Sequence, residues 1–250
     1  MLEDRFFHNQ HFIDYVRLLF ELHRAISEGW DETELGEAIR ERMDEPGSRL
    51  SSNEIASSSG IAADFYSLTD APPVVISPMA ADAWTALQRV FQPRKSMDFH
   101  GALDLLRKHA DTIPPASLAY LRGKIWMEAE EFAIAAAFLK RTNELDASNE
   151  NFRYMALHAL GNANSKSAIP MAQTILTNRE HHPPRLVLKA LDVLIQSIRA
   201  EAGNHPREEL KSFIPIIQNS IFRFETSGEA ENDPSLLVSS INHLDFLRAS

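Results

Sequence analysis

Residues 116–148 read ASLAYLRGKIWMEAEEFAIAAAFLKRTNELDAS, and they contain two apolar runs with the spacing of an α-helix. In the second run, Phe132 lies three residues before Ala135 and Leu139 lies four residues after it, so the three side chains share one helix face. The acidic segment EAEE separates the two runs. The stretch therefore predicts two amphipathic helices joined by a short, solvated turn.

The central alanine of this stretch recurs at a fixed period. Ala102, Ala135 and Ala168 are spaced 33 residues apart, each inside an apolar run. Such a period indicates a repeated pair of helices, which buries its apolar face only by stacking on neighbouring pairs. Small side chains recur where two helix backbones cross closely. We therefore predict an all-α protein in which the three alanines are buried at helix crossings. The alternative is an ordinary helical bundle with a coincidental alanine spacing.

Five residues of the central stretch resemble the signature positions of the tetratricopeptide repeat family: Gly123, Trp126, Phe132, Ala135 and Leu139. The resemblance is best over 116–148 and implies an α–α superhelix of degenerate helix pairs. The copies on either side match less well. Ser165 stands where Phe132 would repeat, and the segment 92–97 interrupts the preceding copy. We expect about three degenerate repeats rather than a clean array.

The resemblance also implies a partner-binding groove on the first helices of successive repeats. Lys124 and Arg153 would receive an acidic partner there. The family's clamp for a terminal carboxylate needs more basic and asparagine positions than this chain has, so chaperone-tail binding is not supported. Carried over residue by residue, the groove consists of Tyr120, Lys124, Met127, Arg153, Leu157 and Leu160.

The charge distribution divides the chain into two predicted domains. Residues 1–75 carry 15 acidic and 6 basic side chains, which is a net charge of −9 out of −10 for the whole chain. We predict an acidic three-helix module over 1–70, a proline-rich linker over 69–78, and a repeat domain over 79–250. The first domain resembles a module of uncharacterised bacterial proteins through the segments YVRLL, ELH and ADFYSL. This second resemblance implies no activity.

Capping and proline signals place several helices. We expect three N-terminal helices. The first covers 8–28, the second runs from a capping box of Asp31 and Glu34 to Pro46, and the third covers 53–68. The segment after Pro184 is apolar on almost every face, which predicts a central, buried helix. Pro215 lies inside a later helical pattern and predicts a kink or a break.

The last helix is expected to begin at Asp233-Pro234 and to carry one apolar stripe. The stripe either packs inward on the preceding helices, which we favour, or offers a free docking face. Its members are Leu236, Leu237, Ile241, Leu244 and Leu247.

Composition narrows the classes of function. The chain has 250 residues, 44% of them apolar, and no cysteine, so disulfides, thiolate metal sites and cysteine nucleophiles are excluded. No stretch has the apolar length of a membrane span, and the N-terminus lacks the pattern of a signal peptide, so we expect a cytoplasmic protein that does not bind membranes. The acidic first domain and the absence of a basic stripe elsewhere argue against nucleic-acid binding.

Motifs that carry chemistry are not found in the sequence. The segment 161–167, GNANSKS, is similar to a phosphate-binding loop but lacks its second glycine, so we interpret it as a turn. His8 and His11, and likewise His181 and His182, are interpreted as surface histidines rather than metal ligands. We expect no catalytic residue, metal or cofactor.

Two functions are consistent with these observations. The first is a non-catalytic scaffold that binds a protein or peptide partner on its helical-repeat surface. The alternative is a sensor, regulatory or oligomerisation arm of a larger enzyme or effector whose catalytic part lies outside this chain. The sequence does not indicate an oligomeric state.

Overall fold

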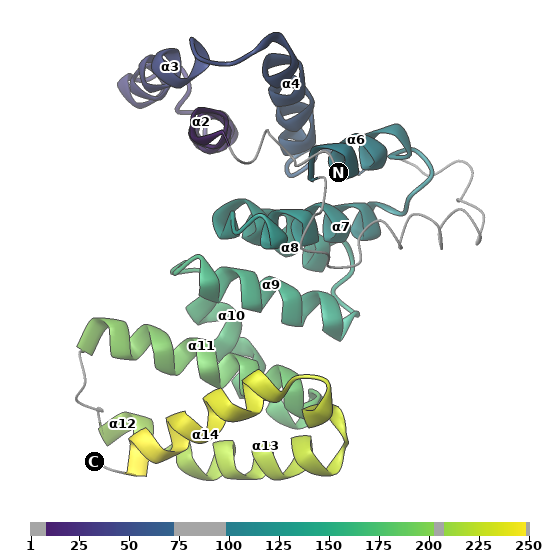
Figure 1. The fold of residues 1–250 in the computed structure, drawn as a ribbon. Helices are drawn as coiled ribbons and strands as arrows, with labels where there is room; N and C mark the ends of the chain where they lie inside the picture. The colour runs from purple at the N-terminus through teal and green to yellow at the C-terminus, as the bar shows by residue number, and fades with distance from the viewer. Residues whose placement is uncertain (1–8, 73–98, 203–207, 249–250) are drawn as a thin grey trace. The chain divides into compact units, whose positions relative to one another are not determined.

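The computed structural model describes residues 9–72, 99–202 and 208–248, except the side chains of 201, 202, 208 and 209. Over these residues the protein is all-α and contains no strand, as the sequence predicts (Figure 1). The chain divides into two compact units, Met1–Leu145 and Asp146–Ser250. The domain boundary predicted at 69–78 and the interruption predicted at 92–97 lie mostly or wholly outside the described residues, and both stay predictions.

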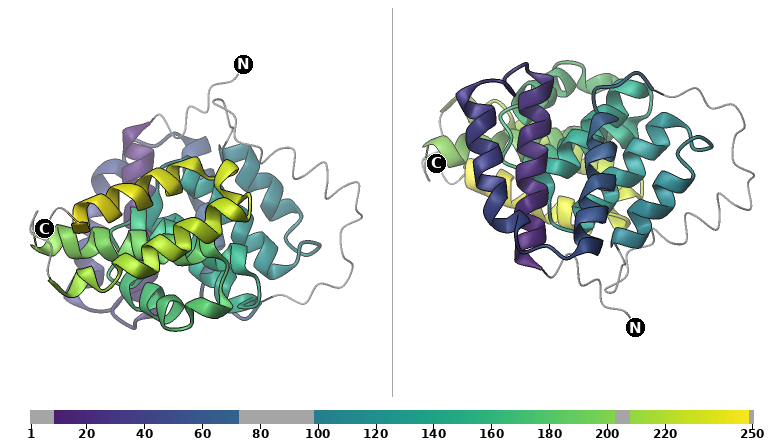
Figure 2. Two further views of the ribbon diagram at one scale, coloured as in Figure 1. Left: turned by 90° about the horizontal axis from the view of Figure 1, so that it is seen from below. Right: turned by 90° about the horizontal axis from the view of Figure 1, so that it is seen from above.

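Unit 1 begins with three helices, α2 (Gln10–Ser27), α3 (Glu34–Gly47) and α4 (Ser52–Tyr66). Helix α2 packs against both α3 and α4, and these helices lie side by side in the right-hand view of Figure 2. Gly29, with φ of 75°, follows the end of α2, as expected of a residue that adopts the left-handed region without strain.

The capping box predicted for α3 is wrong. Thr33 is the N-cap of α3 and makes no side-chain cap bond, while the Asp31 carbonyl accepts a hydrogen bond from Arg40 Nη1 at 2.8 Å. A complete capping box is found instead at the start of α4, where the Ser51 hydroxyl and the Glu54 carboxylate bond each other's backbone N–H groups. The local spacing is similar in both places, and the path of the chain decides which one forms the box.

The rest of unit 1 is formed by α6 (Phe99–Lys108), α7 (Pro115–Glu128) and α8 (Phe132–Leu145). Ala102 and Ala135 are fully buried, as the 33-residue period predicts. Helices α7 and α8 cross closely at Gly123. A Cβ atom at this position would lie only 2.6 Å from Leu139 Cγ. Gly123 and Leu139 are two of the signature positions named above, and their packing explains why a residue without a side chain is needed at one of them.

The N-terminal helices share an aromatic core with the helices that follow. The ring centroid of Phe65 in α4 lies 6.3 Å from that of Trp126 in α7 and 6.2 Å from that of Phe138 in α8. On the surface, Arg17 of α2 forms an ion pair with Glu131 at 2.7 Å. Glu131 is therefore a structural contact and not part of a freely solvated acidic turn.

Unit 2 is organised around one long helix, α11 (Pro184–Ala202). Every residue from Leu186 to Ile195 is buried, which confirms the prediction of a central helix. Helix α11 packs against α9 (Glu150–Asn162), α10 (Ala168–Thr177), α13 (Ile214–Thr226) and α14 (Pro234–Arg248). Shorter elements connect them: η1 (Arg179–His181), α12 (Glu208–Lys211) and η2 (Glu229–Glu231).

Several details of unit 2 follow the sequence signals. Ala168 is buried at the start of α10, although α10 packs more extensively on α11 than on α9. Of the segment 161–167, which is predicted to be a turn, Gly161 and Asn162 still belong to α9 and only 163–167 form the turn before α10. The predicted break at Pro215 is confirmed, because α12 ends at Lys211 and α13 starts at Ile214 with the proline in its first turn. Helix α14 starts at Pro234, as predicted.

Candidate functional site

The six predicted groove residues are divided between the two units, so the structure does not test the groove as a whole. In unit 1 they lie on α7 and are half-buried, and the Lys124 ammonium lies 5.9 Å from the ring centroid of Tyr120. In unit 2, Leu157 and Leu160 of α9 are buried. Arg153 is held inside its own unit, since it donates to Glu150 Oε1 at 3.0 Å and to the Ala147 carbonyl at 2.5 Å.

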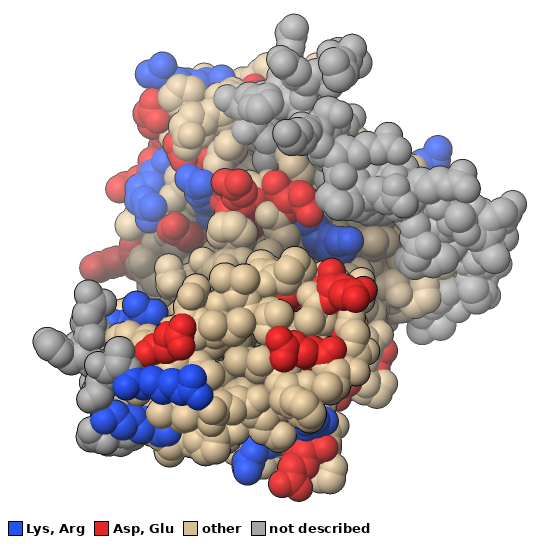
Figure 3. Space-filling model, turned by 60° about the horizontal axis from the view of Figure 1, so that its bottom comes forward, with Lys and Arg blue, Asp and Glu red and all other residues tan. Residues whose placement is uncertain are grey.

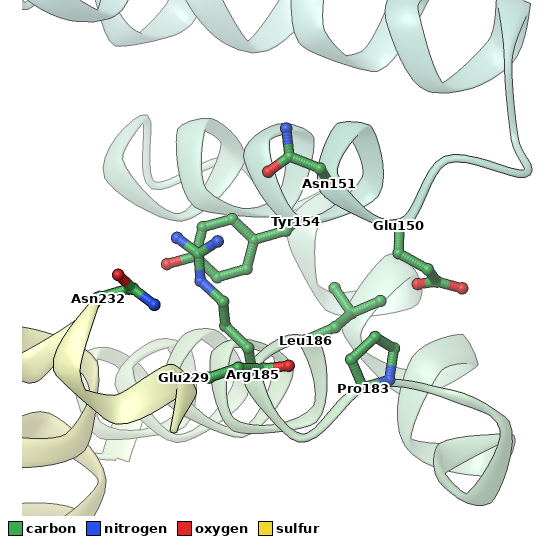
Figure 4. A pocket seen from close by; sticks show the side chains of 8 residues that line it. All are labelled: Glu150, Asn151, Tyr154, Pro183, Arg185, Leu186, Glu229 and Asn232. Atoms are coloured by element: carbon green, nitrogen blue, oxygen red, sulfur yellow. The ribbon is translucent and has the colours of Figure 1, made fainter. Parts of the chain in front are cut away.

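A pocket of about 250 Å³ opens in unit 2 beside this arginine (Figure 4). It lies between the start of α9, the start of α11 and the η2 turn. Its polar residues come from all three elements, and its apolar residues come from the Pro183-Pro184 corner and α11. The lining residues are Glu150, Asn151, Tyr154, Pro183, Arg185, Leu186, Glu229 and Asn232.

One wall of the pocket is a fixed group of three side chains. The guanidinium carbon of Arg185 lies 3.9 Å from the ring centroid of Tyr154, as in a cation–π contact. The Tyr154 hydroxyl donates to Asp233 Oδ2 at 2.6 Å, and Arg185 Nε donates to the same oxygen at 3.3 Å. Burial and the bond to Asp233 raise the pKa of Tyr154, so the phenol keeps its proton at neutral pH. The arginine charge is thus paired with the Asp233 carboxylate.

Two carboxylates of the pocket are incompletely bonded. Glu150 accepts from Arg153 and lies 3.2 Å from His182 Nδ1, but both of these contacts use the oxygen Oε1. Within the described part of the chain, Glu150 Oε2 and Glu229 Oε2 are buried and have no hydrogen-bond partner. Buried carboxylate oxygens usually accept hydrogen bonds. The interpretation of His182 as a solvated residue is wrong, because its side chain is only 13% exposed.

A second feature of unit 2 is the outer face of the hairpin formed by α13 and α14. The two helices pack side by side (Figure 2, left). Phe222 lies four residues before the end of α13 and is 64% exposed, and Val238 lies four residues after the start of α14 and is 58% exposed. Ile241 follows three residues later on the same helix face and is 40% exposed. We call these three residues the hairpin face.

Figure 3 views the side of the molecule that carries α13 and α14. Its central area shows no Lys, Arg, Asp or Glu side chain, and charged groups lie around it. The apolar stripe predicted for α14 is divided by the structure: Leu236, Leu244 and Leu247 pack inward, Leu237 is half-buried, and Ile241 is exposed. The favoured inward packing holds for most of the stripe, and Ile241 contributes to the hairpin face.

Each unit also buries a charged cluster. In unit 1, Asp64 of α4 accepts from Arg107 at 2.6 Å and from Arg122 at 2.5 Å. In unit 2, Asp192 of α11 accepts from Lys189 at 2.8 Å and lies 2.9 Å from His243 Nε2. These two clusters join helices within a unit and do not face the pocket.

The cluster of unit 2 does not have the geometry of an activated serine. The Ser239 hydroxyl donates to Asp192 Oδ1 at 2.6 Å, and His243 Nε2 faces that same oxygen. A nucleophilic serine needs the histidine between itself and the carboxylate, with a different ring nitrogen toward each. Burial would raise the pKa of Asp192, but the hydrogen bonds from His243, Lys189 and Ser239 outweigh it and lower that pKa. The arrangement stabilises a buried carboxylate.

Across the described ranges, no group of three or more His, Asp or Glu side chains could hold a metal ion; His8 lies outside these ranges. In the same part of the chain, no helix combines the length and apolarity needed to cross a membrane. Comparisons of the chain with protein-family models, curated proteins and solved structures found no match.

Sequence reasoning missed both features of unit 2. The pocket brings together Glu150, Arg185 and Glu229, which lie 35 and 44 residues apart in the sequence and share no motif. The Pro183-Pro184 pair and Asp233-Pro234 predicted only the starts of the two helices that lie beside the pocket. The hairpin face was anticipated only through Ile241, because an apolar period shows a helix stripe but not which of its members remain exposed.

Proposed function

We propose that this protein is a non-catalytic interaction scaffold that docks a partner protein on the hairpin face of unit 2. The observation that carries the proposal is the exposure of Phe222, Val238 and Ile241 on two helices that pack side by side. Large apolar side chains that are exposed together mark interaction sites more often than scattered single residues do. Aromatic anchors such as Phe222 commonly supply much of the binding energy at such sites.

A second exposed apolar group lies in unit 1, around the connection from α2 to α3. Trp30 and Leu35 are each 49% exposed, and Ile26 is 37% exposed. Acidic residues alternate with this group in the sequence, among them Glu28, Glu32 and Glu34. Charged neighbours of this kind are depleted at the centres of protein interfaces. We therefore place the docking surface on the hairpin face and use the unit 1 group as its control.

The helical-repeat reading of the sequence supports the same class of function. Stacked helix pairs offer extended surfaces for partner segments. The Lys124 and Arg153 groove remains a second site within this proposal, and it predicts an acidic partner. Because Arg153 already bonds Glu150 and Ala147, the hairpin face is the stronger candidate.

The experiment is affinity capture from the native cell with the tagged full chain, quantified by mass spectrometry. Phe222→Ser combined with Val238→Ser should reduce the recovery of the specific partner by about tenfold or more, as expected for loss of interface anchors. The control variant Trp30→Ser with Leu35→Ser should capture the partner normally. Circular dichroism verifies that each variant keeps its helicity.

Other outcomes contradict the assignment in distinct ways. Undiminished capture by the Phe222 and Val238 variant rules out the hairpin face. Loss of capture with Lys124→Glu and Arg153→Glu alone would move the site to the predicted groove. Loss with the Trp30 and Leu35 variant alone would move it to unit 1. Absence of any reproducible partner of the wild-type chain would overturn the scaffold function itself.

A further inference from the structure

The pocket of unit 2 has the size of one side chain rather than of a cofactor. Its volume is about 250 Å³, whereas pockets for drug-sized ligands and cofactors usually have about 300–1,000 Å³. Figure 4 shows the apolar side chains of Pro183 and Leu186 between the carboxylate of Glu150 on one side and Glu229 on the other. An aliphatic stem with a polar end fits this arrangement of surfaces.

The charges of the pocket favour a cation. Arg185 is the basic residue of the lining, and its charge is paired with Asp233, which is not a lining residue. Glu229 has no such ion-pair partner among the described residues, and Glu150 uses one of its two oxygens for Arg153 and His182. One oxygen of each carboxylate is buried and has no hydrogen-bond partner among the described residues, so hydrogen bonds do not fully compensate the negative charge beside the pocket. An anionic ligand would bring no donor and would be repelled by both groups.

We propose that this pocket receives a basic side chain, lysine or arginine, from the partner protein. The methylene groups of the side chain would pack on Pro183 and Leu186, and its positive charge would lie between the carboxylates of Glu150 and Glu229. The proposal rests on the proposed function, because the ligand is part of a docked protein. Glu229 and Asn232 lie in the η2 connection between α13 and α14, so the pocket adjoins the hairpin that carries the docking face.

The wall of the pocket that contains Tyr154 and Arg185 is preformed and would favour the binding of such a side chain. Tyr154, Arg185 and Asp233 hold one another through a stacked ring and two hydrogen bonds. Because Asp233 neutralises the arginine, the pocket keeps a polar, rigid wall without an uncompensated positive charge. A preformed wall lowers the entropy that a ligand loses on binding.

The test is a nuclear magnetic resonance titration of the full ¹⁵N-labelled chain with blocked tripeptides. The probes are Ala-Lys-Ala and Ala-Arg-Ala, with Ala-norleucine-Ala as the uncharged control and Ala-Glu-Ala as the anionic control. We expect the two basic probes to shift the amide signals of Asn151, Tyr154 and Asn232 saturably, with a Kd of about 1 mM as is reasonable for one side chain. The relative affinities of the lysine and arginine probes identify the preferred side chain.

Glu229→Gln is the decisive variant, because Glu229 is the carboxylate without an ion pair among the described residues. It should weaken the binding of the basic probes about fivefold or more, as expected for loss of a charged acceptor. The matched control is Glu225→Gln, an exposed position on α13 outside the pocket lining, which should leave the affinity unchanged. The amide spectrum of each variant shows directly whether its fold is retained.

The outcomes separate this proposal from the proposed function. Equal shifts with the norleucine or glutamate probe, no saturable shift with either basic probe, or unchanged binding by Glu229→Gln would each overturn the basic-side-chain pocket. Those results would leave partner capture through the hairpin face intact. Conversely, failure of capture with normal tripeptide binding would overturn the scaffold proposal and leave a small cation site.

Discussion

Both units of this protein bury an aspartate, and the two aspartates bond different partners. In unit 1, Asp64 is paired with two arginines, which keep their charge at any accessible pH. In unit 2, Asp192 accepts from the titratable groups Lys189 and His243, and from the neutral Ser239 and Gln196. Because the partners differ, removal of the aspartate leaves a different set of charged groups unpaired in each unit.

The two carboxyl groups differ in pKa for a related reason. Burial raises the pKa of Asp64, and the charges of Arg122 and Arg107 oppose that shift without cancelling it. At Asp192 burial acts in the same direction, but the hydrogen bonds it accepts reverse the shift and lower the pKa. The direction of each shift is therefore set by the balance between burial and the charged or hydrogen-bonding partners of that carboxyl group.

The largest effect should come from removing the aspartate of unit 1. Asp64→Ala leaves the buried Arg122 without its charge partner, which should lower the free energy of unfolding by about 3–5 kcal/mol. Asp192→Ala should cost less, about 2–3 kcal/mol, because two of the partners that it leaves, Ser239 and Gln196, are neutral. Urea unfolding of the full chain, followed by circular dichroism, measures both values.

A double variant serves as the control for this prediction. Asp64→Leu with Arg122→Met replaces the buried pair by apolar side chains and should recover a large part of the stability lost in Asp64→Ala. Arg107 keeps a partner in this variant, since it also bonds Asp104. A smaller loss for Asp64→Ala than for Asp192→Ala would show that the comparison of the two clusters is wrong.

The second effect is a dependence of stability on pH that His158 introduces into unit 2. Burial, with the nearby charge of Lys189, lowers the pKa of His158 to about 4, while Asp233 and Asp192 oppose this shift. Between pH 4 and an ordinary histidine pKa of about 6.5, the unfolded chain therefore binds the proton more strongly than the folded protein. The free energy of unfolding should fall by up to about 3 kcal/mol as the pH decreases through this window.

His158→Gln tests this dependence, because it removes the titrating group from α9. Its unfolding free energy should fall less between pH 6.5 and 4 than that of the wild type, while His181→Gln, at an exposed position of the same unit, should behave as the wild type. Burial also lowers the pKa of His23 in unit 1, so part of the slope should remain in the variant. An unchanged slope in His158→Gln would contradict the assignment.

The smallest effect concerns two glycines, one in each unit. A Cβ atom on Gly123 would meet Leu139 Cγ at 2.6 Å and Cδ2 at 2.9 Å, whereas one on Gly161 would meet only Val193 Cγ2 closely, at 2.8 Å. Overpacking costs about 1–3 kcal/mol, and alanine regains about 0.5–1 kcal/mol of helix stability over glycine. Gly123→Ala should therefore be destabilising by about 1–2 kcal/mol, and Gly161→Ala by less.

Thermal melts of the two glycine variants give the ranking directly. The closer contact in unit 1 involves a branching carbon, which cannot move without the rest of the leucine side chain. The contact in unit 2 involves a terminal methyl group. Equal or reversed melting temperatures would mean that the crossing of α7 and α8 relaxes more easily than its geometry indicates.

Local patterns in the sequence were sufficient to predict the helices and the central position of α11. Prolines and glycines marked the ends of α2, α13 and α14, because their backbone restrictions act within a few residues. The 33-residue period located Ala102, Ala135 and Ala168 in the core, because a small residue between apolar neighbours indicates a close crossing wherever the partner helix comes from. The capping box of Asp31 and Glu34 was misplaced, since an alternative bond to the Asp31 carbonyl arises only in the folded turn.

By itself the sequence determined the all-α class and several helix boundaries, which depend on neighbours within one or two turns of helix, and its 33-residue period indicated the burial of the repeated alanines. Only the tertiary structure decided which charges pair and which apolar residues stay exposed. Asp64 bonds Arg122 across 58 residues, and Tyr154 of the pocket lining bonds Asp233 across 79. Such contacts depend on how the helices pack, because hydrogen bonds and burial are set by distances in space and not by spacing along the chain.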